Sequence, residues 1–152
     1  MNESFPAYRT SHSTGPLPEV GSLSSMTVHE RRRVAGRDDI DESLAEALLL
    51  DPDEEIRAAI LSTAWVTPEW LRRLVKRYPA EIQNAMQHEE APSEFLELLS
   101  VGYTGTHTRQ RLTELLGADA DLAREFLVAC SSVDSSDTST TLGDVWRQLT
   151  AV

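Results

Sequence analysis

Residues 51–75 read DPDEEIRAAILSTAWVTPEWLRRLV, and this stretch decides the fold. Asp51 precedes a proline, as an N-cap acid ahead of a first helical turn would. The following run places Ile56 and Ile60 on one helical face. The Thr-Pro-Glu sequence at 67–69 repeats the same kind of start signal. The stretch therefore predicts a helix, a short turn and a second helix.

The pattern recurs along the chain at a spacing of 26 residues. The shared apolar position of the first helices is occupied by Val34, Ile60, Met86 and Leu112, and the position three residues earlier by Arg31, Arg57, Gln83 and Arg109. The second helices match at spacings of 26 and then 25, in the sets Leu44, Trp70, Phe95; Ala45, Leu71, Leu96; and Leu48, Leu74, Leu99. A repeat of this length is one supersecondary unit stacked on its copies, so the sequence predicts an all-α solenoid of about four helix–turn–helix repeats.

The repeats are expected to occupy residues 27–130. Residues 1–26 are rich in Ser, Thr, Pro and Gly and lack apolar periodicity, which predicts a disordered tail. Residues 131–141 are mostly Ser, Thr and Asp and predict a flexible linker. Residues 142–152 predict a short amphipathic helix that either folds back on the last repeat or waits for a partner.

Residues 34–116 resemble the bacterial leucine-rich repeat variant family, whose repeats are similar in style to HEAT repeats. The Asp-Pro at 51–52, the Arg-Ala-Ala-Ile at 57–60 and the Thr-Pro at 67–68 carry the resemblance. It implies a right-handed superhelix of paired short helices, a bacterial protein and no catalytic residues. Some members of that family hold an iron–sulfur cluster on several cysteines, whereas this chain has one cysteine.

The composition bounds the function classes. A net charge of −11 disfavours general nucleic-acid binding and docking on an anionic membrane. The single Cys130 excludes an intramolecular disulfide and a thiolate-based metal centre, so no cofactor is expected. The four histidines are scattered, without close pairing. The start of the chain lacks a secretory signal pattern and no apolar run is long enough for a membrane span, so a cytoplasmic protein is expected.

One helix face is strongly basic. Within 68–77, Trp70, Leu71, Leu74 and Val75 are predicted to face inward and Arg72, Arg73, Lys76 and Arg77 outward. The outward residues either form a docking stripe for an acidic partner or a phosphate-bearing ligand, or are a solvated face near a helix C-terminus.

Residues 38–55 carry nine acidic residues and no basic ones. They could bind a basic protein surface or mimic nucleic acid, and a metal site is disfavoured because no calcium-loop spacing is present. Helix capping and solubility explain them equally simply. Arg31, by contrast, belongs to the repeat, and a structural pairing with carboxylates is favoured over a nucleic-acid arm.

Two further tryptophans are candidates for partner contact: Trp65, in the turn between helices, and Trp146, on the terminal helix. Enzyme motifs such as a Gly-rich phosphate loop or HExxH are absent from the sequence, and a structural thiol is favoured over a catalyst that pairs Cys130 with His88 or His107. The sequence therefore favours a noncatalytic repeat scaffold that binds a protein. The alternatives are a nucleic-acid-associated HEAT-like protein and an acidic inhibitor that mimics nucleic acid.

Overall fold

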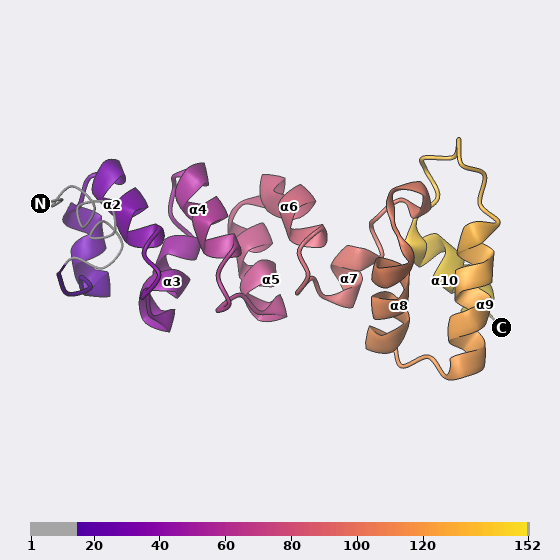
Figure 1. Cartoon of the computed structure of the whole chain (residues 1–152). Coiled ribbons are helices and arrows are strands. Elements are labelled where there is room, and N and C mark those ends of the chain that lie inside the picture. The colour runs from indigo at the N-terminus through magenta and orange to yellow at the C-terminus, as the bar shows by residue number, and fades with distance from the viewer. Residues whose placement is uncertain (1–14, 152) are drawn as a thin grey trace, which may run out of the picture. The chain divides into compact units, whose positions relative to one another are not determined.

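The computed structural model of the chain describes residues 15–151, which form short helices with no β-strand among them (Figure 1). Residues 1–14 and 152, and the part of the predicted tail that they cover, lie outside the described residues. The all-helical fold class predicted from the sequence is confirmed. The chain divides into two compact units, Met1–Arg77 and Tyr78–Val152.

The first unit contains two consecutive helical hairpins. Its elements are η1 (Val20–Ser25), α2 (Val28–Ala35), α3 (Glu42–Leu49), α4 (Glu54–Leu61) and α5 (Pro68–Arg77). Helix α2 packs on α4 and α3 packs on α5, so equivalent helices of successive repeats lie against each other (Figure 1). The predicted repeat positions form the core, with Ile60, Leu71 and Leu74 fully buried.

Side-chain caps fix where these helices begin. Thr27 and Glu30 form a reciprocal capping box at the start of α2, and the Asp41 carboxylate accepts the Leu44 amide at 2.9 Å. The N-cap of α4 lies two residues later than predicted, because the carboxylate of Asp53 rather than that of Asp51 accepts the Ile56 amide. The Asp51 carboxylate instead accepts the Asp53 amide at 2.9 Å, which holds the cap residue itself in place.

An arginine occupies the same repeat position in three of the four repeats and has a structural role in each. Arg31 donates from Nη1 to the Met26 carbonyl at 2.8 Å, and the buried Arg57 donates from Nη1 to the Asp51 carbonyl at 2.8 Å. Arg109 donates from Nη2 to the Val101 carbonyl at 2.9 Å. Each arginine thus reaches back to the connection that enters its own helix, where main-chain carbonyls need donors. Gln83, at the same position, is exposed.

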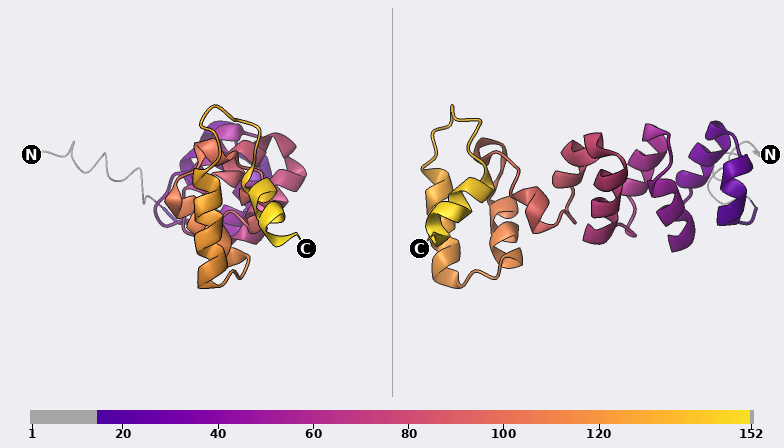
Figure 2. Two further views of the ribbon diagram at one scale, coloured as in Figure 1. Left: turned by 90° about the vertical axis from the view of Figure 1, so that its right-hand side faces the viewer. Right: turned by 180° about the vertical axis from the view of Figure 1, so that it is seen from behind.

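The second unit begins with shorter elements. They are η2 (Pro79–Glu81), α6 (Ile82–Met86), α7 (Ser93–Leu96), η3 (Val101–Tyr103), α8 (Thr106–Leu115), α9 (Ala120–Ser131) and α10 (Leu142–Thr150). Helices α8 and α9 form an antiparallel pair, and α10 lies beside α9 (Figure 2). Gly117, with φ of 74°, follows the end of α8, and the Ala118 amide donates to the Thr113 carbonyl at 3.0 Å.

The third repeat lacks a full second helix because its chain pairs elsewhere. After α7, the Val101 amide donates to the Thr140 carbonyl, and the Leu142 amide donates to the Leu99 carbonyl, both at 2.9 Å. Ser100 and Thr141 form an isolated antiparallel bridge between these segments. These bonds need extended backbone, so they stop the helix that the repeat pattern predicts.

Two segments expected to be irregular contain defined structure. Within 15–26, the chain forms η1, and this element contacts α3 of the first repeat. Leu23 of η1 is buried, with 8% of the residue exposed. Within 131–141, Asp137 accepts the amide and hydroxyl of both Ser139 and Thr140. Short polar side chains that bond the local backbone hold this turn without an apolar core.

These hydrogen bonds hold the pKa of the Asp137 carboxyl well below its usual range. The folded-state pKa is depressed, so the stabilisation is complete above the ordinary value of 3.8 and is lost as pH falls through the folded-state pKa. Asp137→Ala at neutral pH is expected to speed amide exchange at Ser139 and Thr140 about tenfold, as loss of one charge-assisted hydrogen bond would.

The matched control for this prediction is Asp134→Ala. Asp134 accepts the Ser136 amide at 2.9 Å in the same segment, so its removal should affect Ser136 and leave Ser139 protected. Amide exchange followed by NMR measures both. Unchanged exchange at Ser139 and Thr140 in Asp137→Ala would contradict the assigned role of Asp137.

Candidate functional site

Trp65 is exposed and yet held in one orientation. Its side chain lies in the turn between α4 and α5 with 40% of the residue exposed. The indole Nε1 donates to the Ile40 carbonyl at 3.1 Å, which ties the turn of one repeat to the turn of the preceding repeat. An aromatic ring fixed in this way loses little conformational entropy when a partner covers it.

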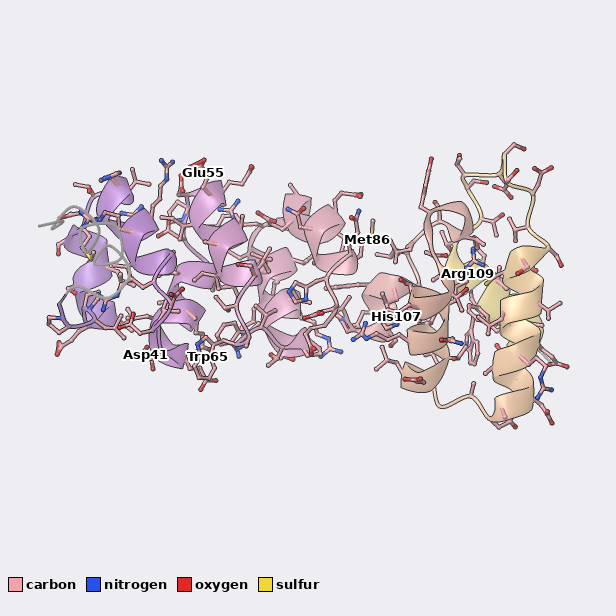
Figure 3. The ribbon with its side chains drawn as sticks, viewed as in Figure 1. Asp41, Glu55, Trp65, Met86, His107 and Arg109 are labelled. Carbon is pink, nitrogen blue, oxygen red and sulfur yellow. The ribbon has the colours of Figure 1, made fainter. Side chains whose placement is uncertain are left out.

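The ring borders an open concavity of about 450 Å³ in the first unit. Small and apolar groups form much of its wall, among them Ala35, Gly36, Ala59 and Ala64. In Figure 3, Trp65 and Asp41 lie at one edge of this unit and Glu55 at the opposite edge. A rigid aromatic beside small residues is the kind of surface on which an apolar partner side chain can be buried.

Trp65 does not belong to the repeat pattern. The preceding repeat has Asp39 at the equivalent position and the following repeat has Glu90. Its neighbour Val66, by contrast, matches Ile40 and Ala91, and all three are buried. The repeat pattern explains the buried neighbour but does not explain why an exposed tryptophan stands at position 65.

The basic face of α5 is exposed as predicted, but it is partly neutralised. Arg72 pairs with Glu69 at 3.4 Å on its own helix, and Arg73 pairs with Glu46 of α3. Both arginine side chains remain more than two-fifths exposed. Lys76 and Arg77 also lie on the exposed face. The pairs reduce the positive charge that a phosphate-bearing ligand would meet at this helix.

Several of the acidic residues at 38–55 have structural partners. Arg32 pairs with Asp53 at 2.9 Å, and this guanidinium lowers the pKa of the Asp53 carboxyl. Arg37 pairs with Asp39 at 2.8 Å and lowers the pKa of that carboxyl in the same way. The acids are thus distributed over caps and ion pairs, which gives no support to a row of phosphate-like charges. Among the residues described, no group of three or more His, Cys, Asp and Glu is placed to hold a metal ion.

The other two tryptophans pack within the protein. Trp70 is 4% exposed in the core of the first unit. Trp146 is half-buried, and its ring meets that of Phe126 edge-on with centroids 5.8 Å apart and an angle of 71°. The terminal helix α10 therefore docks on α9. The Trp146 ring, which was predicted to contact a partner, packs against Phe126 of the same chain.

Cys130 is buried, and burial raises the pKa of its thiol, against a smaller opposing effect of Arg109. A raised pKa disfavours the thiolate that a nucleophile needs. His88 and His107 both line one cavity of the second unit, and Cys130 is not part of its lining. No local pattern predicts that the two histidines line one cavity, because 19 positions separate them and they occupy different repeats.

No helix among residues 15–151 is long and apolar enough to cross a membrane. Comparison of the chain with protein-family models, with curated proteins and with solved structures finds no match.

Proposed function

We propose that this chain is a noncatalytic helical-repeat scaffold that binds a protein partner through the surface around Trp65. We place it among the right-handed α-solenoids of leucine-rich repeat variant type, in the bacterial cytoplasm. Support comes from the first unit, where successive repeats stack equivalent helices and are linked at their turns by the Trp65–Ile40 hydrogen bond.

The observation that carries the proposal is the exposed, anchored indole. Of the three tryptophans, Trp65 is the one that is exposed, with 40% of the residue open to solvent, and the concavity beside it is preformed. Trp residues in such settings often dominate binding energy because they bury a large area without losing many rotamers. Lys76 and Arg77, on the exposed face of α5, would favour a partner that carries acidic residues.

A capture experiment with the full chain tests the proposal. The immobilised wild-type chain and Trp65→Ala are exposed to extract of the native host, and each captured protein is then purified and its affinity measured by calorimetry. Trp65→Ala is expected to weaken binding at least tenfold, in keeping with the loss of an interface hot spot.

Val28→Ala is the matched control, because Val28 is 39% exposed in the same unit and does not line the concavity. Thermal unfolding of each variant separates lost binding from the lost Trp65–Ile40 hydrogen bond. A second variant reverses the charges of Arg72, Arg73, Lys76 and Arg77. A partner that binds Trp65→Ala as tightly as wild type would refute the assignment to this surface.

A further inference from the structure

The second unit contains an open cavity of about 540 Å³ beside α8. His107, Thr108 and Arg111 line it from one face of α8, and Thr104 lines it from the segment before that helix. Met86 and Gln87, at the end of α6, line it from the other side, and Leu96 and Leu99 add apolar wall. The cavity therefore combines a polar side with an apolar side, as sites for small organic ligands do.

Arg111 has an unsatisfied donor. Its Nη1 atom is buried and has no hydrogen-bond partner among the described residues, and it is the one buried side-chain nitrogen or oxygen there of which this is true. By contrast, Arg109, two residues earlier, donates to both the Thr104 hydroxyl and the Val101 carbonyl. A buried guanidinium nitrogen without an acceptor is costly, and Arg111 also lines the cavity, so a small rotation of this side chain toward a bound anion would give the nitrogen an acceptor.

The remaining polar groups are mostly donors or neutral. The Nδ1 atom of His88 accepts the Glu90 amide at 2.9 Å, which orients this imidazole in the lining. The N-cap residue of α8 is Gly105, which has no side chain to cap the helix, and the first turn of the helix contains no acidic residue. Its partial positive charge is thus not offset locally. Glu89 is the one carboxylate in the lining, and it is exposed.

We propose that this cavity binds a small organic anion, with its carboxylate or phosphate group on Arg111 and its apolar body against Leu96 and Leu99. The guanidinium matches both kinds of oxyanion in bidentate geometry, and the Thr108 hydroxyl can add a donor. The site lies in a different unit from Trp65, so a test of this site does not depend on the proposed protein-binding surface.

Binding is tested on the full chain with phenyl phosphate and phenylacetate as probes. Benzyl alcohol serves as the uncharged analogue and inorganic phosphate as the anion without an apolar body. Amide shifts in 15N spectra locate the site and titration calorimetry gives the affinity. We expect at least one aromatic anion to shift His107, Thr108 and Arg111 resonances and to bind at least tenfold more tightly than either analogue. The tighter of the two anions identifies the charged group.

Variants sharpen the test in both directions. Arg111→Met should weaken binding of the anion at least tenfold, whereas Arg124→Met, an exposed arginine of α9, should leave it unchanged. Glu89→Gln removes the opposing charge and should tighten binding about twofold. Glu89 is exposed, so this variant remains informative if Arg111→Met fails to fold.

Three results would overturn the proposal. The first is that benzyl alcohol binds as tightly as the anions, which would make the cavity a merely apolar void. The second is that inorganic phosphate binds as tightly as phenyl phosphate, which would leave the apolar wall without a role. The third is that no probe shifts these resonances at millimolar concentration.

Discussion

Asp51→Ala is expected to lower the free energy of unfolding of the first unit by about 3 kcal/mol. The Asp51 side chain is 6% exposed, and its Oδ2 atom accepts the Arg31 Nε–H at 2.7 Å. Its Oδ1 atom accepts the Asp53 amide, the amide of the α4 cap residue. Removing the carboxylate leaves the guanidinium of Arg31, itself only 18% exposed, without its counter-charge.

The size of this effect follows from burial. An exposed ion pair contributes about 0–1 kcal/mol, because water and salt screen both charges. Breaking a buried pair by removing one partner costs about 3–5 kcal/mol, because the other charge stays desolvated. The Arg31–Asp51 pair lies near the buried case, and Arg31 keeps its bond to the Met26 carbonyl, which places the effect at the lower end.

Urea unfolding followed by site-resolved amide exchange measures the loss. Glu55→Ala is the control, because Glu55 also pairs with an arginine of α2, at 3.2 Å, but its side chain is 72% exposed. It should change stability by less than about 0.5 kcal/mol. A double variant, Arg31→Met with Asp51→Leu, should recover much of the loss because no unpaired charge remains. If Asp51→Ala matched wild type, the pair would have no role in stability.

The sequence predicted the parts of the fold that depend on local signals. The Thr-Pro signal at 67–68 marked the start of α5, and the acidic cap signal placed the start of α4 within two residues. The repeated apolar positions identified the core of each hairpin. A further buried set at the same spacing, Ile40, Val66 and Ala91, was not among the predicted positions. Local signals suffice here because each short helix needs only a cap and one apolar stripe.

The sequence failed where distant segments meet. Helix α7 ends early because Leu99 and Val101 pair with residues about forty positions later, which no local pattern encodes. The same holds for the candidate sites. The anchoring of Trp65 depends on a carbonyl of the preceding repeat, and the cavity of the second unit is lined both by His88, after α6, and by Arg111 of α8.

Phe126→Ala is expected to destabilise the second unit by about 3–5 kcal/mol. Phe126 is fully buried in α9, so truncation removes its apolar surface from the core and leaves a cavity. It also removes the edge-to-face contact with Trp146, a pair of a kind worth about 0.5–1.5 kcal/mol beyond burial. The effect should therefore extend to α10, which packs on α9.

The two ends of α10 should respond differently. At its start, the Leu142 and Gly143 amides donate to the carbonyls of Leu99 and Glu97 at 2.9 and 3.0 Å, and Thr141 and Asp144 form a capping box. None of these bonds involves Phe126. The start of α10 should stay protected from amide exchange in Phe126→Ala, while the turn that carries Trp146 loosens.

Urea unfolding and the Trp146 indole resonance measure both consequences, with Val128→Ala as the control because Val128 is 62% exposed on the same helix. The control should change stability by less than about 0.5 kcal/mol. This experiment also decides how Trp146 could contact a partner. If the Trp146 ring stays ordered without Phe126, other neighbours hold it, and a partner can contact only its exposed part. A ring that becomes mobile is held by Phe126, and a partner must then outcompete that contact to bind it.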